Sequence, residues 1–129
     1  MNATKARPID PTLAGKSTQF LYVLRLVPRL HEEEAWTDAD HAAIGRHFAW
    51  LQAAAERGQL ILAGRTAEPL DRTFGLAIFE AANEAAARTF MAADPAFAEK
   101  IMTAELHPYR VAVQRARPSI RSQPMSTNS

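Results

Sequence analysis

The central element of the predicted fold is the segment QFLYVLRLV at residues 19–27, which Pro28 ends. It is dense in β-branched, aromatic and leucine side chains, which favour a strand. One face of that strand carries Phe20, Tyr22, Leu24 and Leu26, and the other carries Leu21, Val23 and Val27, with Arg25 as the only charge. Since a strand that is apolar on both faces is covered on both, we expect neither face of this strand to meet water.

A helix is expected after this strand. Thr37 is a suitable N-cap with carboxylates in the first turn after it, and Gly58 is a suitable residue to stop the helix after about Arg57. The apolar stripe expected on this helix consists of Ile44, Phe48, Leu51 and Ala55.

Three more strands and a second helix complete the pattern. A short strand is expected over 59–63, closed by Gly64, and another over 73–80. Asn83 can cap a second helix that runs to about Ala93, where the Asp94-Pro95 step breaks it because the residue before proline avoids the α region. The last strand is expected over 103–114, with Pro108 pointing to an edge position.

This order of elements predicts an α+β fold of the ferredoxin-like βαββαβ type, a four-stranded antiparallel sheet with both helices on one face. The other face of the sheet would then present the second apolar sides of the strands. A second copy of the chain is the simplest cover for such a face, so the pattern also predicts a homodimer through the open sheet face. The terminal arms are the alternative cover.

Length and composition bound the organisation and the function. The chain has 129 residues, with 15 Lys plus Arg against 14 Asp plus Glu, and no Cys. This charge balance predicts no nucleic acid and no membrane as partner. The lack of cysteine excludes a disulfide scaffold, a thiolate metal site and a cysteine nucleophile. We expect one folded domain over 19–115 between flexible arms at 1–18 and 116–129, in a cytoplasmic protein.

His47 and Asp94 are the strongest candidates for chemistry. His47 lies on or beside the buried face of the first helix, where it is either a structural histidine, satisfied by a carbonyl or a water, or a general base. Asp94 ends the second helix, where it either caps the short helix that follows or orients an imidazole. Of the remaining histidines, His31 is expected in a loop and His41 in the solvated first turn of the helix, while His107, in the last strand, faces either the binding cleft or the solvent. No two histidines have the spacing of a helical metal site, so we expect no metal.

Several short motifs together resemble the YciI-like, or YCII-related, family. They are RHFAWL at 46–51, GQL at 58–60, LAG at 62–64, Gly75, AADP at 92–95 and Pro108-Tyr109. The resemblance implies the dimeric α/β barrel, in which two ferredoxin-like sheets face each other, and an active-site pair that carries over to His47 and Asp94. Two positions depart from the family pattern and bear on the substrate, Arg65 in place of the usual proline and Ala96 in place of a frequent aromatic.

The leading hypothesis is a small, cofactor-independent acid–base enzyme of the lyase or isomerase type. His47 would act as general base or acid, oriented by Asp94, in elimination (dehydrochlorination has been linked to the family) or isomerisation of a small hydroxylated or cyclic organic molecule. Arg46, Arg65 or His107 would bind an anionic oxygen of that substrate. The alternative is a non-catalytic, small-ligand-binding or accessory dimeric barrel protein, and a related barrel monooxygenase or haem-degrading domain is a third hypothesis.

Overall fold

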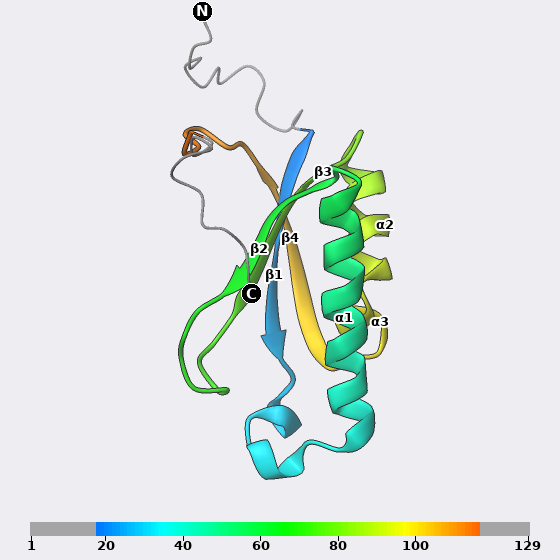
Figure 1. Cartoon of the computed structure of the whole chain (residues 1–129), viewed down its shortest axis with the longest axis vertical. Helices are drawn as coiled ribbons and strands as arrows, with labels where there is room; N and C mark the ends of the chain where they lie inside the picture. The colour runs from blue at the N-terminus through cyan, green and yellow to red at the C-terminus, as the bar shows by residue number, and fades with distance from the viewer. Residues whose placement is uncertain (1–17, 117–129) are drawn as a thin grey trace, which may run out of the picture.

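The computed structural model describes residues 18–116 and forms a single antiparallel sheet with its helices on one side (Figure 1). The arms expected over 1–18 and 116–129 lie, apart from their innermost residues, outside the described part. The elements are β1 (Gln19–Leu26), η2 (Pro28–Leu30), η3 (Glu33–Ala35), α1 (Asp38–Glu56), β2 (Leu60–Arg65), β3 (Gly75–Glu80), α2 (Glu84–Ala93), α3 (Pro95–Ala98) and β4 (Met102–Tyr109). Within 18–116, no helix has the length and apolar character needed to cross a membrane.

The four strands lie in the order β2-β3-β1-β4, and all neighbouring pairs are antiparallel. This is the ferredoxin-like arrangement, so the predicted fold class is confirmed. β1 is central, and its Tyr22 stands opposite Ala77 of β3 and Leu106 of β4. β4 is an edge strand, which agrees with the position expected for Pro108.

Two predicted strand ends are wrong, each for a local reason. Gly64 does not close β2 but pairs with Leu76, and the strand continues to Arg65. The last strand ends at Tyr109 rather than at 114, because Tyr109 pairs with Gln19, the first residue of β1. Beyond that pair, β1 offers no further strand backbone to which β4 can bond.

Aromatic side chains dominate the core between the sheet and the helices. Phe79 of β3 stacks on Phe90 of α2 with ring centroids 4.3 Å apart, and Tyr22 meets the edge of Phe79 at 5.6 Å. Such pairs stabilise a fold beyond the apolar area that they bury. A second, smaller cluster joins the end of β1 to α1 and α3, and consists of Leu26, Leu30, Ala43, Ala96 and Ile101.

The helix α1 buries a different face from the one predicted by its apolar stripe. Its caps are as expected, with Thr37 in a capping box and Gly58 at a φ of 86° just beyond the end. The buried face, however, consists of Asp40, Ala43, His47, Leu51 and Ala54, while Phe48 is 56% exposed and Ala55 is exposed. The helix is turned by about one residue from the expected stripe, because the two polar side chains on its buried face, Asp40 and His47, are satisfied there by Arg29 and Asp94.

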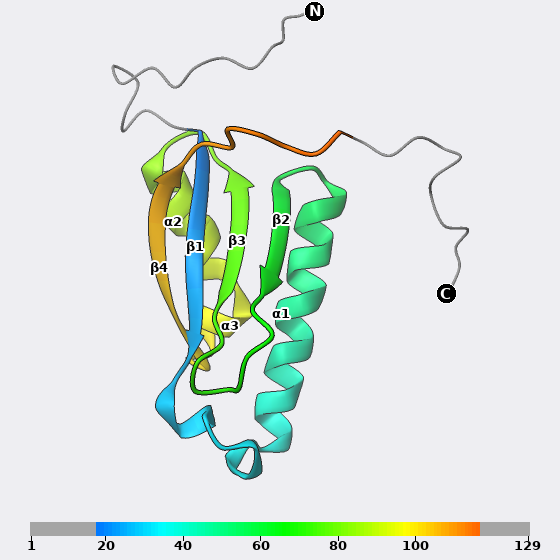
Figure 2. The same ribbon diagram turned by 90° about the vertical axis from the view of Figure 1, so that its left-hand side faces the viewer.

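The opposite face of the sheet is not covered by any described helix (Figure 2). We call its apolar part the open-face patch, made of Leu21, Val23, Leu62, Leu76 and Ile78. Leu62 is 62% exposed. A hollow of about 260 Å³ lies at the β2–β3 side of this face. Arg25 covers the ring of Phe74 at its edge, with the guanidinium carbon 4.9 Å from the ring centroid.

Candidate active site

His47 and Asp94 meet in the interior between α1 and the turn that joins α2 to α3. The imidazole Nδ1 lies 2.7 Å from Oδ1 of Asp94, although 46 residues separate the two positions in the chain. His47 is only 5% exposed and Asp94 is fully buried. Burial strengthens the attraction between such groups and fixes their geometry.

Asp94 is held by three hydrogen bonds, and its contacts fit both of the roles that the sequence left open. Its Oδ1 accepts the backbone N–H of Ala96 at 2.9 Å, so the side chain caps α3. The same oxygen faces His47 Nδ1 at 2.7 Å. Its Oδ2 accepts the hydroxyl of Tyr22 at 2.7 Å. A carboxylate with three donors is well suited to carry a negative charge in a buried position.

Tyr22 is the site residue that the sequence analysis missed. It was counted among the apolar side chains of β1, and its ring is indeed fully buried in the core. The signal was its hydroxyl, because a buried tyrosine oxygen nearly always needs a hydrogen-bond partner. Burial in the first place, and the neighbouring Asp94 in the second, raise the pKa of Tyr22 far above its usual range, so the phenol stays protonated and donates.

The contact with Asp94 determines what the imidazole can do. Because the carboxylate accepts a hydrogen bond from Nδ1, a neutral His47 carries its proton there and leaves Nε2 with a free electron pair. Among the described residues, Nε2 has no hydrogen-bond partner. This is the arrangement of a general base oriented by a carboxylate, which also stabilises the imidazolium when the ring takes a proton.

The three basic residues predicted to bind substrate are dispersed. Arg46 donates two hydrogen bonds to Glu99, at 2.8 and 2.6 Å, and so ties α1 to the end of α3 at the surface. His107 stands opposite Leu21 on the open face, on the other side of the sheet from the dyad. Arg65 is exposed at the end of β2, where it pairs with Gly75 on the helix-covered side.

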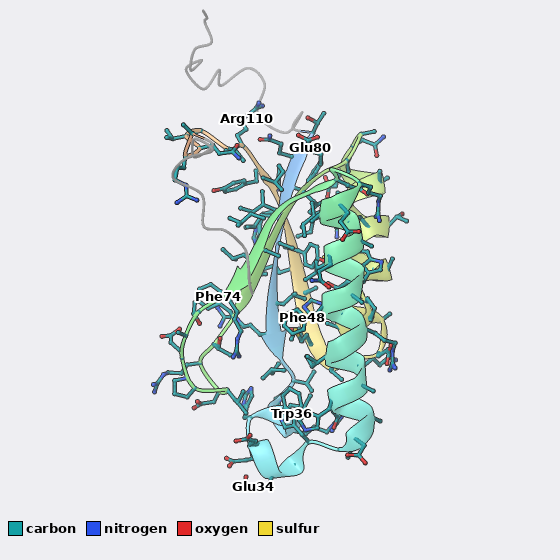
Figure 3. The ribbon with its side chains drawn as sticks, in the orientation of Figure 1. Glu34, Trp36, Phe48, Phe74, Glu80 and Arg110 are labelled. Carbon is teal, nitrogen blue, oxygen red and sulfur yellow. The ribbon has the colours of Figure 1, made fainter. Side chains whose placement is uncertain are left out.

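Phe48 is the exposed aromatic side chain beside the dyad. Its ring centroid lies 5.4 Å from that of His47. Figure 3 shows Phe48 projecting from α1 toward the sheet, while Phe74 lies on the far side of the strands. Two hollows of the described part have neither His47 nor Asp94 in their lining. One lies on the open face, and the other lies where the end of α1 meets β2 and the end of β3.

Comparison with known proteins places the chain in a family. One of the solved structures that it resembles is a variant of SnoaB, a cofactor-independent oxygenase from Streptomyces nogalater. The likeness covers 82% of this chain and 100% of that one, at 14% identity and a TM-score of 0.39. No curated protein matches the sequence. The model of the YCII-related domain matches residues 22–106, well over half of the chain, and includes both His47 and Asp94. The chain therefore belongs to the YCII-related domain family.

Proposed function

We propose that this protein is a cofactor-independent acid–base enzyme in which His47 exchanges a proton with a small organic substrate and Asp94 orients the imidazole. The observation that carries the proposal is the 2.7 Å contact between Nδ1 of His47 and a fully buried carboxylate. A buried pair of this kind, whose second ring nitrogen has no partner within residues 18–116, has the arrangement that a catalytic base requires.

The proposed step is proton abstraction from a carbon next to a carbonyl group. Nε2 of His47 takes the proton, and the electron pair of the broken C–H bond forms a C=C double bond. In an elimination, a leaving group such as chloride departs with its own electron pair. In an isomerisation, the π pair of the carbonyl moves onto its oxygen as the C=C bond forms, and the imidazolium then returns the proton to another atom of this enolate. After an elimination, the imidazolium releases its proton to water. Asp94 favours the first half of either reaction because its charge stabilises the imidazolium.

The surroundings of His47 favour a small cyclic or hydroxylated molecule as substrate. His47 has only 5% of its surface exposed, and the adjacent Phe48 ring is 56% exposed. An exposed aromatic face beside the base suits a flat or cyclic ligand that stacks on it. Arg65 is the cation that we propose for an anionic oxygen of this substrate, since Arg46 is engaged with Glu99.

We further propose that the working unit is a homodimer of the dimeric α/β barrel type, closed by the open-face patch. The patch is apolar across three adjacent strands, and burying such a surface against a second copy is favourable. Replacing Leu62, which lies on the edge strand β2 and is the most exposed side chain of the patch, with aspartate should give a monomer in sedimentation analysis. Val113→Asp, at an 89% exposed position outside the patch, should leave a dimer. A monomeric natural protein, or a Leu62→Asp variant that stays dimeric, would contradict this proposal.

One observation favours a second candidate function, a non-catalytic ligand-binding or accessory protein. Asp94 caps α3, so the dyad also has a structural use. A panel of lactones and hydroxyquinones, assayed for turnover and in parallel for binding by thermal shift, separates the two functions. Turnover that is lost in a folded His47→Ala variant supports the enzyme. Binding without turnover supports the second function, and loss of folding in His47→Ala assigns the residue to the core. Cell fractionation tests the cytoplasmic location, which stays a prediction.

A further inference from the structure

We propose that Tyr22 is a positioning residue of the site, whose buried hydroxyl holds the Asp94 carboxylate so that it accepts the Nδ1 proton of His47 without taking that proton over. The inference rests on the proposed function for its catalytic meaning. Its physical content, a coupling of Tyr22 to His47 through Asp94, can be measured without any substrate.

The geometry links three elements that are remote in sequence. The Tyr22 hydroxyl donates to Oδ2 of Asp94 at 2.7 Å, while His47 and the N–H of Ala96 use Oδ1. Each oxygen of the carboxylate is therefore occupied, and the plane of the group is fixed from two sides. Double support of this kind is how a charged group keeps its orientation in a buried site.

The packing of the Tyr22 ring prevents its hydroxyl from contacting a substrate. Its ring lies in the middle of β1, the central strand, and is fully buried. It is enclosed by the edge contacts with Phe79 at 5.6 Å and with Phe90 at 6.3 Å. A phenol that is so tightly packed cannot approach a substrate, so any effect of Tyr22 on the reaction passes through Asp94.

The hydroxyl changes the strength of the carboxylate as an acceptor. A carboxylate that also accepts a hydrogen bond from a second donor accepts a weaker hydrogen bond from the imidazole. It therefore competes less strongly with the imidazole for the Nδ1 proton. Without the Tyr22 donor, Asp94 would pull the Nδ1 proton more strongly. The proton must stay on the imidazole if the ring is to act as a base at Nε2.

The other charged groups of neighbouring elements have their own partners or lie at the edge of the site. Asp40, on the same buried face of α1, is paired with Arg29 at 2.8 Å. On the outer side, Arg46 is paired with Glu99 at 2.6 Å. Arg65 ends β2 at an exposed position. The buried residues of α2 are Ala87, Phe90 and Met91, so this helix presents no buried charge to the pair.

The test is the proton NMR resonance of the His47 Nδ1–H, which moves downfield as its hydrogen bond to the carboxylate strengthens. We expect Tyr22→Phe, which keeps the ring and removes only the oxygen, to move this resonance downfield. Asp94→Asn should move it upfield because the acceptor loses its charge. Tyr109→Phe is the matched control, since it removes the hydroxyl of the chain's second tyrosine, on the open face of the sheet, and should leave the resonance in place.

An unmoved resonance in Tyr22→Phe would overturn the proposal and leave Tyr22 as a core residue only. If Tyr22→Phe does not fold, 3-fluorotyrosine incorporated into the Tyr109→Phe protein tests the same coupling at the only remaining tyrosine. Its more acidic phenol is a stronger donor, so the resonance should move upfield, and no movement would again overturn the proposal. The resonance reports on the coupling alone. A shifted resonance in a protein without turnover would support the positioning role and contradict the proposed enzyme.

Discussion

Replacing Asp94 with alanine is the perturbation whose cost follows most directly from the structure. The substitution removes the acceptor of three buried donors, which are the Tyr22 hydroxyl, the His47 ring and the N–H of Ala96. Each buried donor left without a partner costs about 1–3 kcal/mol, and the lost N-cap is one of these terms. Removal of a buried charge returns part of its desolvation cost, so we expect a net loss of about 3–5 kcal/mol. That is a large share of the total stability of a small domain, which is about 5–15 kcal/mol.

Asp94→Asn separates the hydrogen bonds from the charge. Its amide oxygen can still accept from Ala96 and from His47, and its NH₂ group can donate to the Tyr22 oxygen, whose own proton then lacks an acceptor. We therefore expect the asparagine variant to lose only about 1–2 kcal/mol, from the one unpaired donor. Stability should therefore fall from the natural protein to Asp94→Asn and further to Asp94→Ala. This order is expected when one carboxylate accepts hydrogen bonds from several donors.

Urea unfolding followed by tryptophan fluorescence measures these differences, provided that all variants are compared at one protomer concentration. Glu99→Ala is the matched control, because it removes an exposed carboxylate just after α3 whose ion-pair partner, within the part of the chain that the structure describes, is Arg46 alone. It should cost at most about 1 kcal/mol. A loss below about 1 kcal/mol in Asp94→Ala, equal to that in Glu99→Ala, would refute the assignment of Asp94 as the centre of a buried network.

Three further predictions concern other parts of the molecule. The Arg29 guanidinium lowers the pKa of Asp40 well below its usual range, so the stabilising effect of this pair is complete above about pH 4 and is lost as the pH falls further. The melting temperature of Asp40→Asn should therefore lie well below that of the natural protein at pH 7, and the difference should narrow toward pH 2. A difference in melting temperature that does not change with pH would contradict this prediction. Gly58→Ala should destabilise the fold by about 1 kcal/mol because the φ of Gly58 is 86°. Gly45→Ala should stabilise the fold by about 0.5–1 kcal/mol because Gly45 lies within α1 with open space around it. Equal melting temperatures for the two variants would contradict this prediction. Phe48→Ala should leave the melting temperature nearly unchanged, since the ring is 56% exposed, but should weaken binding of cyclic compounds in calorimetric titrations, and unchanged affinity would remove Phe48 from the site.

The sequence predicts the sheet well because strand alternation is a local property. The order of the elements, the alternation of side chains along β1 and the caps of both long helices depend on neighbouring residues in the chain, and all three agree with the structure. The cover expected over the second face of β1 is absent from the described residues, where Leu21 and Val23 stay partly exposed. Strand ends are less local. Gly64 stays in β2 because Leu76 pairs with it, and such a partner is not visible in the short strand itself.

The helix face and the third member of the site could not be found from local patterns. Hydrophobicity favours Ile44 and Phe48 as the inner face of α1, but the buried positions include His47 because Asp94 satisfies it from 47 positions away. Tyr22 donates across 72 positions. Long-range hydrogen bonds of this kind let polar groups take core positions that periodicity assigns to apolar side chains.

Hydrogen–deuterium exchange between substrate and solvent shows whether His47 abstracts a proton from carbon. The measurement is the incorporation of deuterium from D₂O at the acidic C–H position of each lactone or hydroxyquinone that the protein binds, compared between the natural protein and His47→Gln. Abstraction by His47 predicts exchange catalysed by the natural protein and slowed about 100-fold or more in the variant, as expected for the loss of a general base. Equal exchange rates in the two proteins, or no exchange in any compound that binds, would contradict the account.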